Sequence, residues 1–120
     1  AKVAAEVADR VGARYLVAFT KSGDTARRLS RLRSRIPMVV FSPEEATRQI
    51  MTLTWGVNTY MTPEFFNQEE MVDAVDRFLR QRDMIEVGER IVIVSGSPMG
   101  VPGKTNNLRV HRIKPKGEDE

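Results

Sequence analysis

The sequence contains no cysteine, one histidine and few aromatic residues, which make up 7% of the chain. Without cysteine there can be no disulfide framework, no thiolate metal cluster and no thiol nucleophile. There is also no apolar run near the ~20 residues that a membrane-spanning helix requires, and no signal peptide. We therefore expect a cytoplasmic protein that binds neither a metal ion nor a membrane.

At 120 residues, of which 41% are hydrophobic, the chain is long enough for one compact domain with a core of its own. It is too short for a complete metabolic enzyme of the large barrel classes. The first residue is Ala1 rather than Met, and it already lies in a helical pattern. We therefore expect the chain to be a piece of a longer protein.

Charge is unevenly distributed, although the formal net charge is only +3. Basic residues crowd the first third of the chain and acidic residues gather in the middle. This polarity suits a small anionic ligand at least as well as a nucleic acid. No aromatic residues interleave the arginines of residues 27–35, so we expect no nucleic-acid partner and interpret these arginines as a solvated helix face or a subunit contact.

Apolar runs and helical patterns alternate along the chain. Helices are predicted at 2–11, from 24 or 25 to about 33, at 43 to about 53 and at 68 to about 84, and strands at 15–19, 38–41, 56–61, 91–94 and 108–113. Ser42 as N-cap and Pro43 at the first helical position predict the start of the third helix. The alternation predicts an α/β fold with three αβα layers and a five-stranded, mostly parallel sheet. The last strand follows its neighbour without a helix, so we expect it antiparallel at an edge.

A turn after the first buried strand has the composition of a phosphate site. Residues 20–25 bring together three hydroxyls, one glycine and one lysine ahead of a helix N-terminus. Hydroxyls, free backbone amides, the positive end of a helix and an ammonium group are the groups that bind phosphate. The carboxylate of Asp24 would repel a bound phosphate unless it turns away to cap the helix. A capped helix start without a ligand is the simpler alternative.

A second candidate segment, residues 96–106, joins the last two strands and is rich in glycine and proline. It contains Gly103-Lys104-Thr105, but it is not a nucleotide-hydrolysing P-loop. Pro98 stands where that motif needs glycine, and a strand rather than a helix follows the lysine. A loop of this length is uncommon without a task, so it could close over an anion held by the first turn. A plain connection between strands is the alternative.

The other candidate residues favour structural roles. His111 lies in a predicted strand and has no serine or cysteine partner for nucleophilic catalysis. Trp55 is better explained by packing than by stacking on a ligand. The acidic pair Glu69-Glu70 falls in a first helical turn, where it complements the helix dipole. We therefore assign no catalytic residue and no metal ligand.

Three motifs stand in order along the chain: Thr20-Lys21-Ser22-Gly23-Asp24-Thr25, then Thr54-Trp55-Gly56-Val57, then Gly96-x-Pro98-x-Gly100-x-x-Gly103-x-Thr105-Asn106 followed by Val110-His111. In this order they resemble the C-terminal domain of bacterial pyruvate kinases, and the ending of the chain looks most like the actinobacterial branch. The resemblance covers nearly the whole chain. It implies that residues 1–113 form the C-terminal α/β domain and that residues 114–120 form a charged tail.

The resemblance implies a regulatory and oligomerisation domain that is not catalytic by itself. The parent enzyme transfers phosphate from phosphoenolpyruvate to ADP in glycolysis, using Mg²⁺ and K⁺ in a barrel domain that this chain lacks. The implied partners are that barrel domain, further copies in a homotetramer and a small phosphorylated effector. The implied phosphate-binding residues are Thr20, Lys21, Ser22, Gly23 and Thr25, and the implied effector loop comprises Gly96, Ser97, Gly100, Gly103, Lys104 and Thr105.

The family pattern also bears on the effector. Members that respond to fructose 1,6-bisphosphate usually bind its second phosphate with a Trp and an Arg, which lie before or early in the helix that precedes the fourth strand. Here that stretch, residues 62–71, has no arginine and three glutamates. A second phosphate would be repelled, so a monophosphate such as glucose 6-phosphate, ribose 5-phosphate or AMP is the predicted effector. The alternative is a freestanding module of the same fold that binds a phosphate ligand or mediates assembly without a kinase domain.

Overall fold

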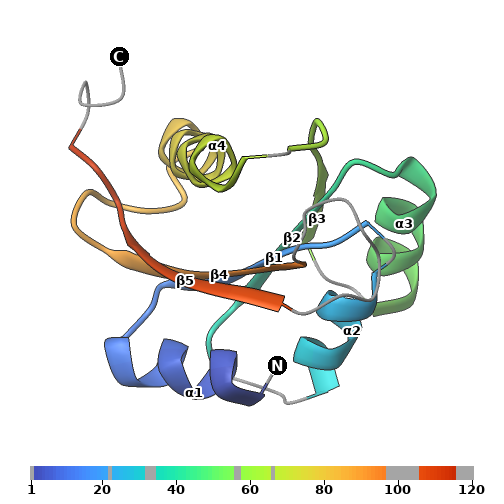
Figure 1. Ribbon diagram of the computed structural model, residues 1–120, viewed down its shortest axis with the longest axis horizontal. Helices are drawn as coiled ribbons and strands as arrows, with labels where there is room; N and C mark the ends of the chain where they lie inside the picture. Colours follow the sequence, from blue (N-terminus) through green and yellow to red (C-terminus); the bar gives the residue numbers. More distant parts are fainter. Residues whose placement is uncertain are drawn as a thin grey trace.

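The computed structural model of the chain describes residues 2–21, 23–31, 35–55, 58–65, 67–96 and 106–115. Five strands alternate with helices along most of this length (Figure 1). The elements are α1 (Lys2–Val11), β1 (Tyr15–Phe19), α2 (Asp24–Arg31), β2 (Met38–Ser42), α3 (Glu45–Ile50), the π-helical turn η1 (Met51–Trp55), β3 (Asn58–Met61), α4 (Gln68–Gln81), β4 (Arg90–Gly96) and β5 (Asn106–Arg112).

One five-stranded sheet, in the order β3-β2-β1-β4-β5, forms the middle layer. The strand β1 pairs in parallel with β2 and β4, and β2 pairs in parallel with β3. The last strand, β5, runs antiparallel to β4 at the edge. The predicted mostly parallel sheet with an antiparallel last strand is therefore confirmed. In the centre, β1 is buried along its whole length, as its continuous apolar run predicts.

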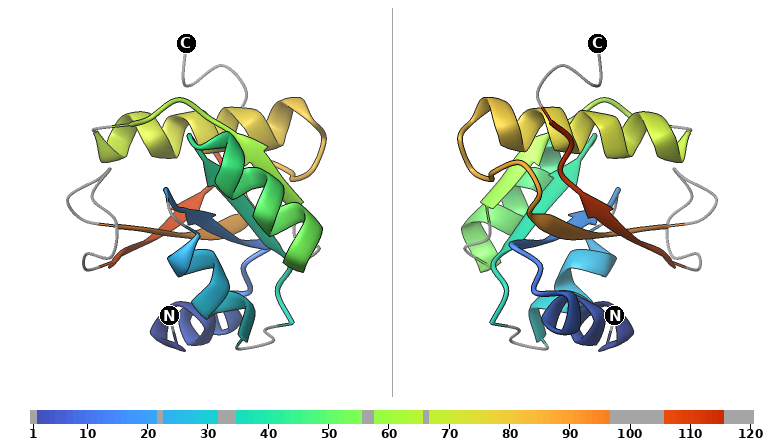
Figure 2. Two further views of the ribbon diagram at one scale, coloured as in Figure 1. Left: turned by 90° about the vertical axis from the view of Figure 1, so that its right-hand side faces the viewer. Right: turned by 90° about the vertical axis from the view of Figure 1, so that its left-hand side faces the viewer.

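Helices cover both faces of this sheet, which gives the three predicted layers (Figure 2). On one face α1 and α2 pack through small side chains, among them Ala4, Ala8 and Ala26. On the other face α4 packs the apolar stripe that includes Met71 and Leu79 against β1, β2 and β4. Among the described residues, no helix combines the length and the apolar character that crossing a membrane requires.

The predicted start of the third helix is wrong. The helix begins at Glu45, so Pro43 is not its first residue and Ser42 is not its N-cap. Ser42 is instead the last residue of β2 and lies opposite Met61 in β3. Its hydroxyl accepts the N–H of Glu44 at 3.1 Å, within a local turn. The gain of a cross-strand partner for a buried residue outweighs the local capping pattern.

Several other boundaries differ from the predictions. The helix predicted to 53 changes at Met51 into the π-helical turn η1, and α4 ends at Gln81, two residues before Asp83 takes a φ of 57°. Both β4 and β5 are longer than predicted because Gly96 pairs with Asn106. The predicted ends of the second helix (32–33) and start of the third strand (56–57) lie outside the described residues, as do residues 116–120 of the predicted tail.

Candidate functional site

The two predicted effector-binding segments begin side by side at the carboxyl ends of β1 and β4, in the middle of the sheet. The strands β1 and β4 are parallel neighbours, and Phe19 lies opposite Ser95 in their register. Thr20 and Gly96 directly follow these two residues. The strand order also reverses here, since β2 and β3 lie beyond β1 while β5 lies beyond β4. Open α/β sheets bind their ligands beyond the carboxyl ends of the strands at such a reversal.

The turn after β1 is organised by its own hydrogen bonds. Thr20 donates its N–H to the carbonyl of Phe41 at 3.0 Å, which extends the pairing of β1 with β2. The Oγ1 of Thr20 accepts the N–H of Gly23 at 2.8 Å, and the Gly23 carbonyl accepts the N–H of Arg27 at 2.9 Å as α2 begins. The Gly23 amide is therefore already engaged. The Thr20 hydroxyl keeps a hydrogen that it can donate to a ligand.

The helix α3 supports this turn from the side of β2. The hydroxyl of Thr47 donates to the Lys21 carbonyl at 2.8 Å, which directs that carbonyl toward α3. Gly23 has a φ of 94°, and a Cβ placed on it would lie 3.4 Å from Sδ of Met51 and 3.6 Å from Cγ2 of Thr47. These are ordinary contact distances, so the left-handed backbone rather than a lack of space favours glycine here.

The lysine of the turn is paired with a carboxylate. The Nζ atom of Lys21 lies 2.9 Å from Oε1 of Glu64, which belongs to the segment between β3 and α4. The side chains are 33% and 35% exposed, so water screens this ion pair. The hydrogen bond with Glu64 and its charge raise the pKa of Lys21, and the charge of Glu44 adds to this effect. Lys21 is therefore a cation at neutral pH, and Glu64 is its partner.

The structure describes some of the predicted effector-binding residues. Thr20, Lys21 and Gly23 are described with their surroundings. Thr25 lies in the first turn of α2 and Gly96 ends β4, and for these two the backbone alone is described. The remaining predicted residues lie outside the described part of the chain; they are Ser22, Ser97, Gly100, Gly103, Lys104 and Thr105.

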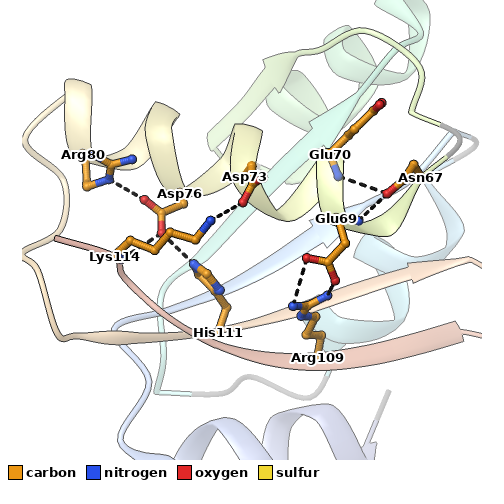
Figure 3. Close-up of polar contacts among 9 residues, drawn as sticks. All are labelled: Asn67, Glu69, Glu70, Asp73, Asp76, Arg80, Arg109, His111 and Lys114. Carbon is orange, nitrogen blue, oxygen red and sulfur yellow. Dashed lines mark hydrogen bonds and ion pairs between the residues drawn. The ribbon is translucent and has the colours of Figure 1, made fainter. Parts of the chain in front are cut away.

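A second polar cluster, which the sequence does not signal, joins α4 to β5 (Figure 3). The carboxylate of Asp76 is buried, and its Oδ2 lies 2.6 Å from Nε2 of His111. The same oxygen accepts the Lys114 N–H at 3.0 Å, and Oδ1 accepts from Nε of Arg80. Burial disfavours the charged carboxyl, but the hydrogen bonds from His111, Lys114 and Arg80 outweigh it and lower the pKa of Asp76. His111 thus has a structural contact, in line with its interpretation from the sequence.

Two further ion pairs, one exposed and one half-buried, extend this cluster along α4. The Nη1 atom of Arg109 lies 2.5 Å from Oε1 of Glu69, and Nζ of Lys114 lies 2.5 Å from Oδ1 of Asp73. Glu69, Asp73 and Asp76 are spaced four and three residues apart, which places them on one helix face. The cluster therefore fastens the edge strand to α4. Within the described residues, no group of three or more histidines, aspartates or glutamates could hold a metal ion.

The strand order, the antiparallel fifth strand and the turn at the reversal of the sheet place the chain among open, three-layered α/β domains. A family model described as "Pyruvate kinase, alpha/beta domain" matches residues 1–111. The chain therefore belongs to the family of pyruvate kinase α/β domains, as its motifs predicted.

Individual relatives agree with this assignment. The pyruvate kinase of Corynebacterium glutamicum is 46% identical over 110 residues, which cover 92% of this chain and 23% of that protein. The pyruvate kinase of Mycobacterium tuberculosis is 39% identical over 117 residues, or 98% of this chain and 24% of that protein. Both organisms are actinobacteria, which confirms the predicted branch. The chain spans less than a quarter of these relatives.

A solved structure supports the fold independently. The structure described as Cryptosporidium parvum pyruvate kinase in complex with ADP superimposes with a TM-score of 0.79 at 24% sequence identity. The match covers 92% of this chain and 22% of that one. The α/β architecture found here is therefore that of a segment of a much longer solved chain.

Proposed function

We propose that this chain is the regulatory and oligomerisation domain of a cytoplasmic pyruvate kinase, and that it binds the phosphate of a small effector at residues 20–25. One observation carries the proposal. Thr20 and Gly96, the first residues of the two predicted segments, follow neighbouring strands at the point where the strand order reverses. A ligand held by the turn would therefore lie next to the start of the loop at 96–105.

Each group of the turn has a distinct part in this proposal. The Thr20 hydroxyl donates to the phosphate while its lone pair holds the Gly23 amide. Lys21 supplies the positive charge, and the hydroxyls of Ser22 and Thr25 supply further donors at the N-terminus of α2. Gly96, Ser97, Gly100, Gly103, Lys104 and Thr105 cover the rest of the effector.

A monophosphate is the preferred effector class, with glucose 6-phosphate, ribose 5-phosphate and AMP as the candidates. The position of Glu64 beside Lys21 supports this choice, because the carboxylate lies next to the group that would bind the first phosphate. A second phosphate in the same neighbourhood would meet negative charge. Fructose 1,6-bisphosphate is accordingly expected to bind less well.

The proposal assigns the chemistry of the enzyme to the part of the protein outside this chain. A barrel domain would transfer phosphate from phosphoenolpyruvate to ADP, with Mg²⁺ and K⁺ bound there. This domain would take part in the homotetramer and transmit effector binding to the barrel. It would hold no metal ion and no catalytic residue of its own.

Thermal denaturation of the chain with each of the four phosphates tests the proposal. A ligand that binds only the folded state at 100 times its Kd stabilises it by about 2.7 kcal/mol. We expect the monophosphates to raise the thermal midpoint, and the double variant Ser22→Ala with Thr25→Ala to abolish the effect. Thr52→Ala, which removes an exposed hydroxyl of η1, is the matched control and should keep the rise in thermal midpoint. The proposal is wrong if no phosphate stabilises the chain, or if the double variant responds like the wild type.

A further inference from the structure

We propose that Glu64 is a specificity-determining residue of the effector site. In the free domain its carboxylate forms an ion pair with the ammonium group of Lys21. An effector phosphate binds by displacing this carboxylate from Lys21. This inference rests on the proposed function and gives Glu64, which lies outside both predicted binding segments, a direct part in effector binding. Glu64 would act as a built-in competitor that only a strongly charged anion displaces.

The position of Glu64 is fixed by contacts on both sides of it. Two residues before it, the Thr62 N–H donates to the Ser42 carbonyl at 3.1 Å and so continues the pairing of β3 with β2. One residue after it, the ring of Phe65 packs edge-on against Phe19, with ring centroids 5.7 Å apart. Phe19 immediately precedes the phosphate turn. The segment is therefore held against the turn, and the Lys21–Glu64 contact follows from this anchoring.

The chemistry of the two anions determines which one binds Lys21. A carboxylate carries one negative charge, whereas a phosphate monoester carries about 1.5 to 2 at pH 7 and offers three acceptor oxygens. The Lys21–Glu64 pair is partly exposed and contributes little, so a phosphate that also binds the hydroxyls of the turn can displace it. A singly charged anion gains nothing over Glu64. The displaced carboxylate stays nearby on its anchored segment and repels any second phosphate.

Isothermal titration with glucose 6-phosphate and fructose 1,6-bisphosphate tests this inference on the whole chain. We expect Glu64→Gln to bind glucose 6-phosphate about two- to fivefold more tightly than the wild type, because the competitor loses its charge. The affinity for fructose 1,6-bisphosphate should rise by a larger factor. Glu86→Gln is the matched control. It also removes one exposed negative charge, but Glu86 precedes the amino end of β4, whereas the candidate site lies at the carboxyl end of that strand. This control should leave both affinities unchanged.

A second variant distinguishes competition from general repulsion. In a Lys21→Met background, Glu64→Gln should no longer improve binding of glucose 6-phosphate, because the group for which both anions compete is gone. An improvement of the same size in that background would overturn the inference. So would an unchanged or weaker affinity of Glu64→Gln alone, while binding by the wild type would still uphold the proposed function. If neither wild type nor Glu64→Gln binds any phosphate, both the function and the inference are wrong.

Discussion

The Nε2 atom of His111 lies 2.6 Å from Oδ2 of Asp76, so a buried contact joins the edge strand β5 to the helix that covers it. Asp76 also binds the Lys114 N–H and the Arg80 side chain. Among the described residues, no buried side-chain nitrogen or oxygen lacks a hydrogen-bond partner. A buried carboxylate whose hydrogen bonds are all formed holds its neighbours in place. Loss of one partner leaves its desolvation uncompensated and lowers the free energy of unfolding.

Replacement of Asp76 by asparagine should strongly destabilise the domain. The amide nitrogen would face a donor from Lys114 or Arg80, and the positive charge of Arg80 would lose its buried partner. We expect a loss of about 2–4 kcal/mol in the free energy of unfolding, measured by urea denaturation. Asp73→Asn, which breaks the partly exposed pair with Lys114, is the control and should lose less than about 1 kcal/mol. Equal losses in the two variants would contradict the assigned role of Asp76.

Acid should destabilise the domain through the same carboxylate. The folded state lowers the pKa of Asp76, so its contribution to stability is fully present above the ordinary value of about 3.9. The contribution is lost as the pH falls below that value and through the pKa of the folded state. Urea denaturation between about pH 2.5 and 6 should therefore show stability falling below about pH 4. The fall should be shallower in Asp76→Asn, and an identical pH profile for that variant would refute this reading.

The sequence predicts the three layers and the antiparallel last strand better than it predicts contacts between distant residues. The buried run of β1 and the alternation of strands with helices are local patterns, and both hold in the structure. The ion pair of Lys21 with Glu64 and the contact of His111 with Asp76 join residues 43 and 35 positions apart. No local pattern encodes such pairs, since they depend on which strands become neighbours. Ser42 shows the converse, because a local capping signal gave way to the pairing of β2 with β3.

Replacement of Gly23 by alanine should impair both folding and ligand binding. Its φ of 94° strains any other residue, and we expect a loss of about 1–2 kcal/mol in the free energy of unfolding. Gly12→Ala is the matched control, because Gly12 has a φ of 66° and no atom within 4 Å of the added Cβ. It should lose similar stability in urea denaturation but leave the affinity for glucose 6-phosphate unchanged, whereas Gly23→Ala weakens that affinity. Equal affinities in the two variants would argue against a ligand at this turn.

Thr47 provides a finer test of how the turn is held. Thr47→Val keeps the side-chain shape but removes the hydroxyl that donates to the Lys21 carbonyl. We expect it to lose about 1 kcal/mol of stability and to weaken binding of glucose 6-phosphate by a similar free energy. Thr47→Ser restores the hydroxyl and should restore the affinity in the same calorimetric titration. If both variants bind like the wild type, the contact with α3 has no part in the site.

The candidate site was only partly predictable for a related physical reason. The hydroxyls, the lysine and the glycine of residues 20–25 indicate a phosphate turn because they are close in sequence. The adjacency of Thr20 and Gly96 depends instead on the parallel pairing of β1 with β4, whose residues come from opposite ends of the chain. The prediction of free amides in the turn also needs correction at Gly23, whose N–H is bound to Oγ1 of Thr20.

A phosphate site in the turn after β1 is tested most directly by titrating the isotopically labelled chain with glucose 6-phosphate and following its backbone amide NMR signals. We expect saturable shifts that are largest at Thr20, Lys21, Gly23 and Gly96, with smaller shifts around Glu64. Residues of the Asp76 cluster, such as Asp73 and Arg109, should keep their signals in place. Shifts concentrated in that cluster, or an unchanged spectrum at saturating glucose 6-phosphate, would contradict a phosphate site at the reversal of the sheet.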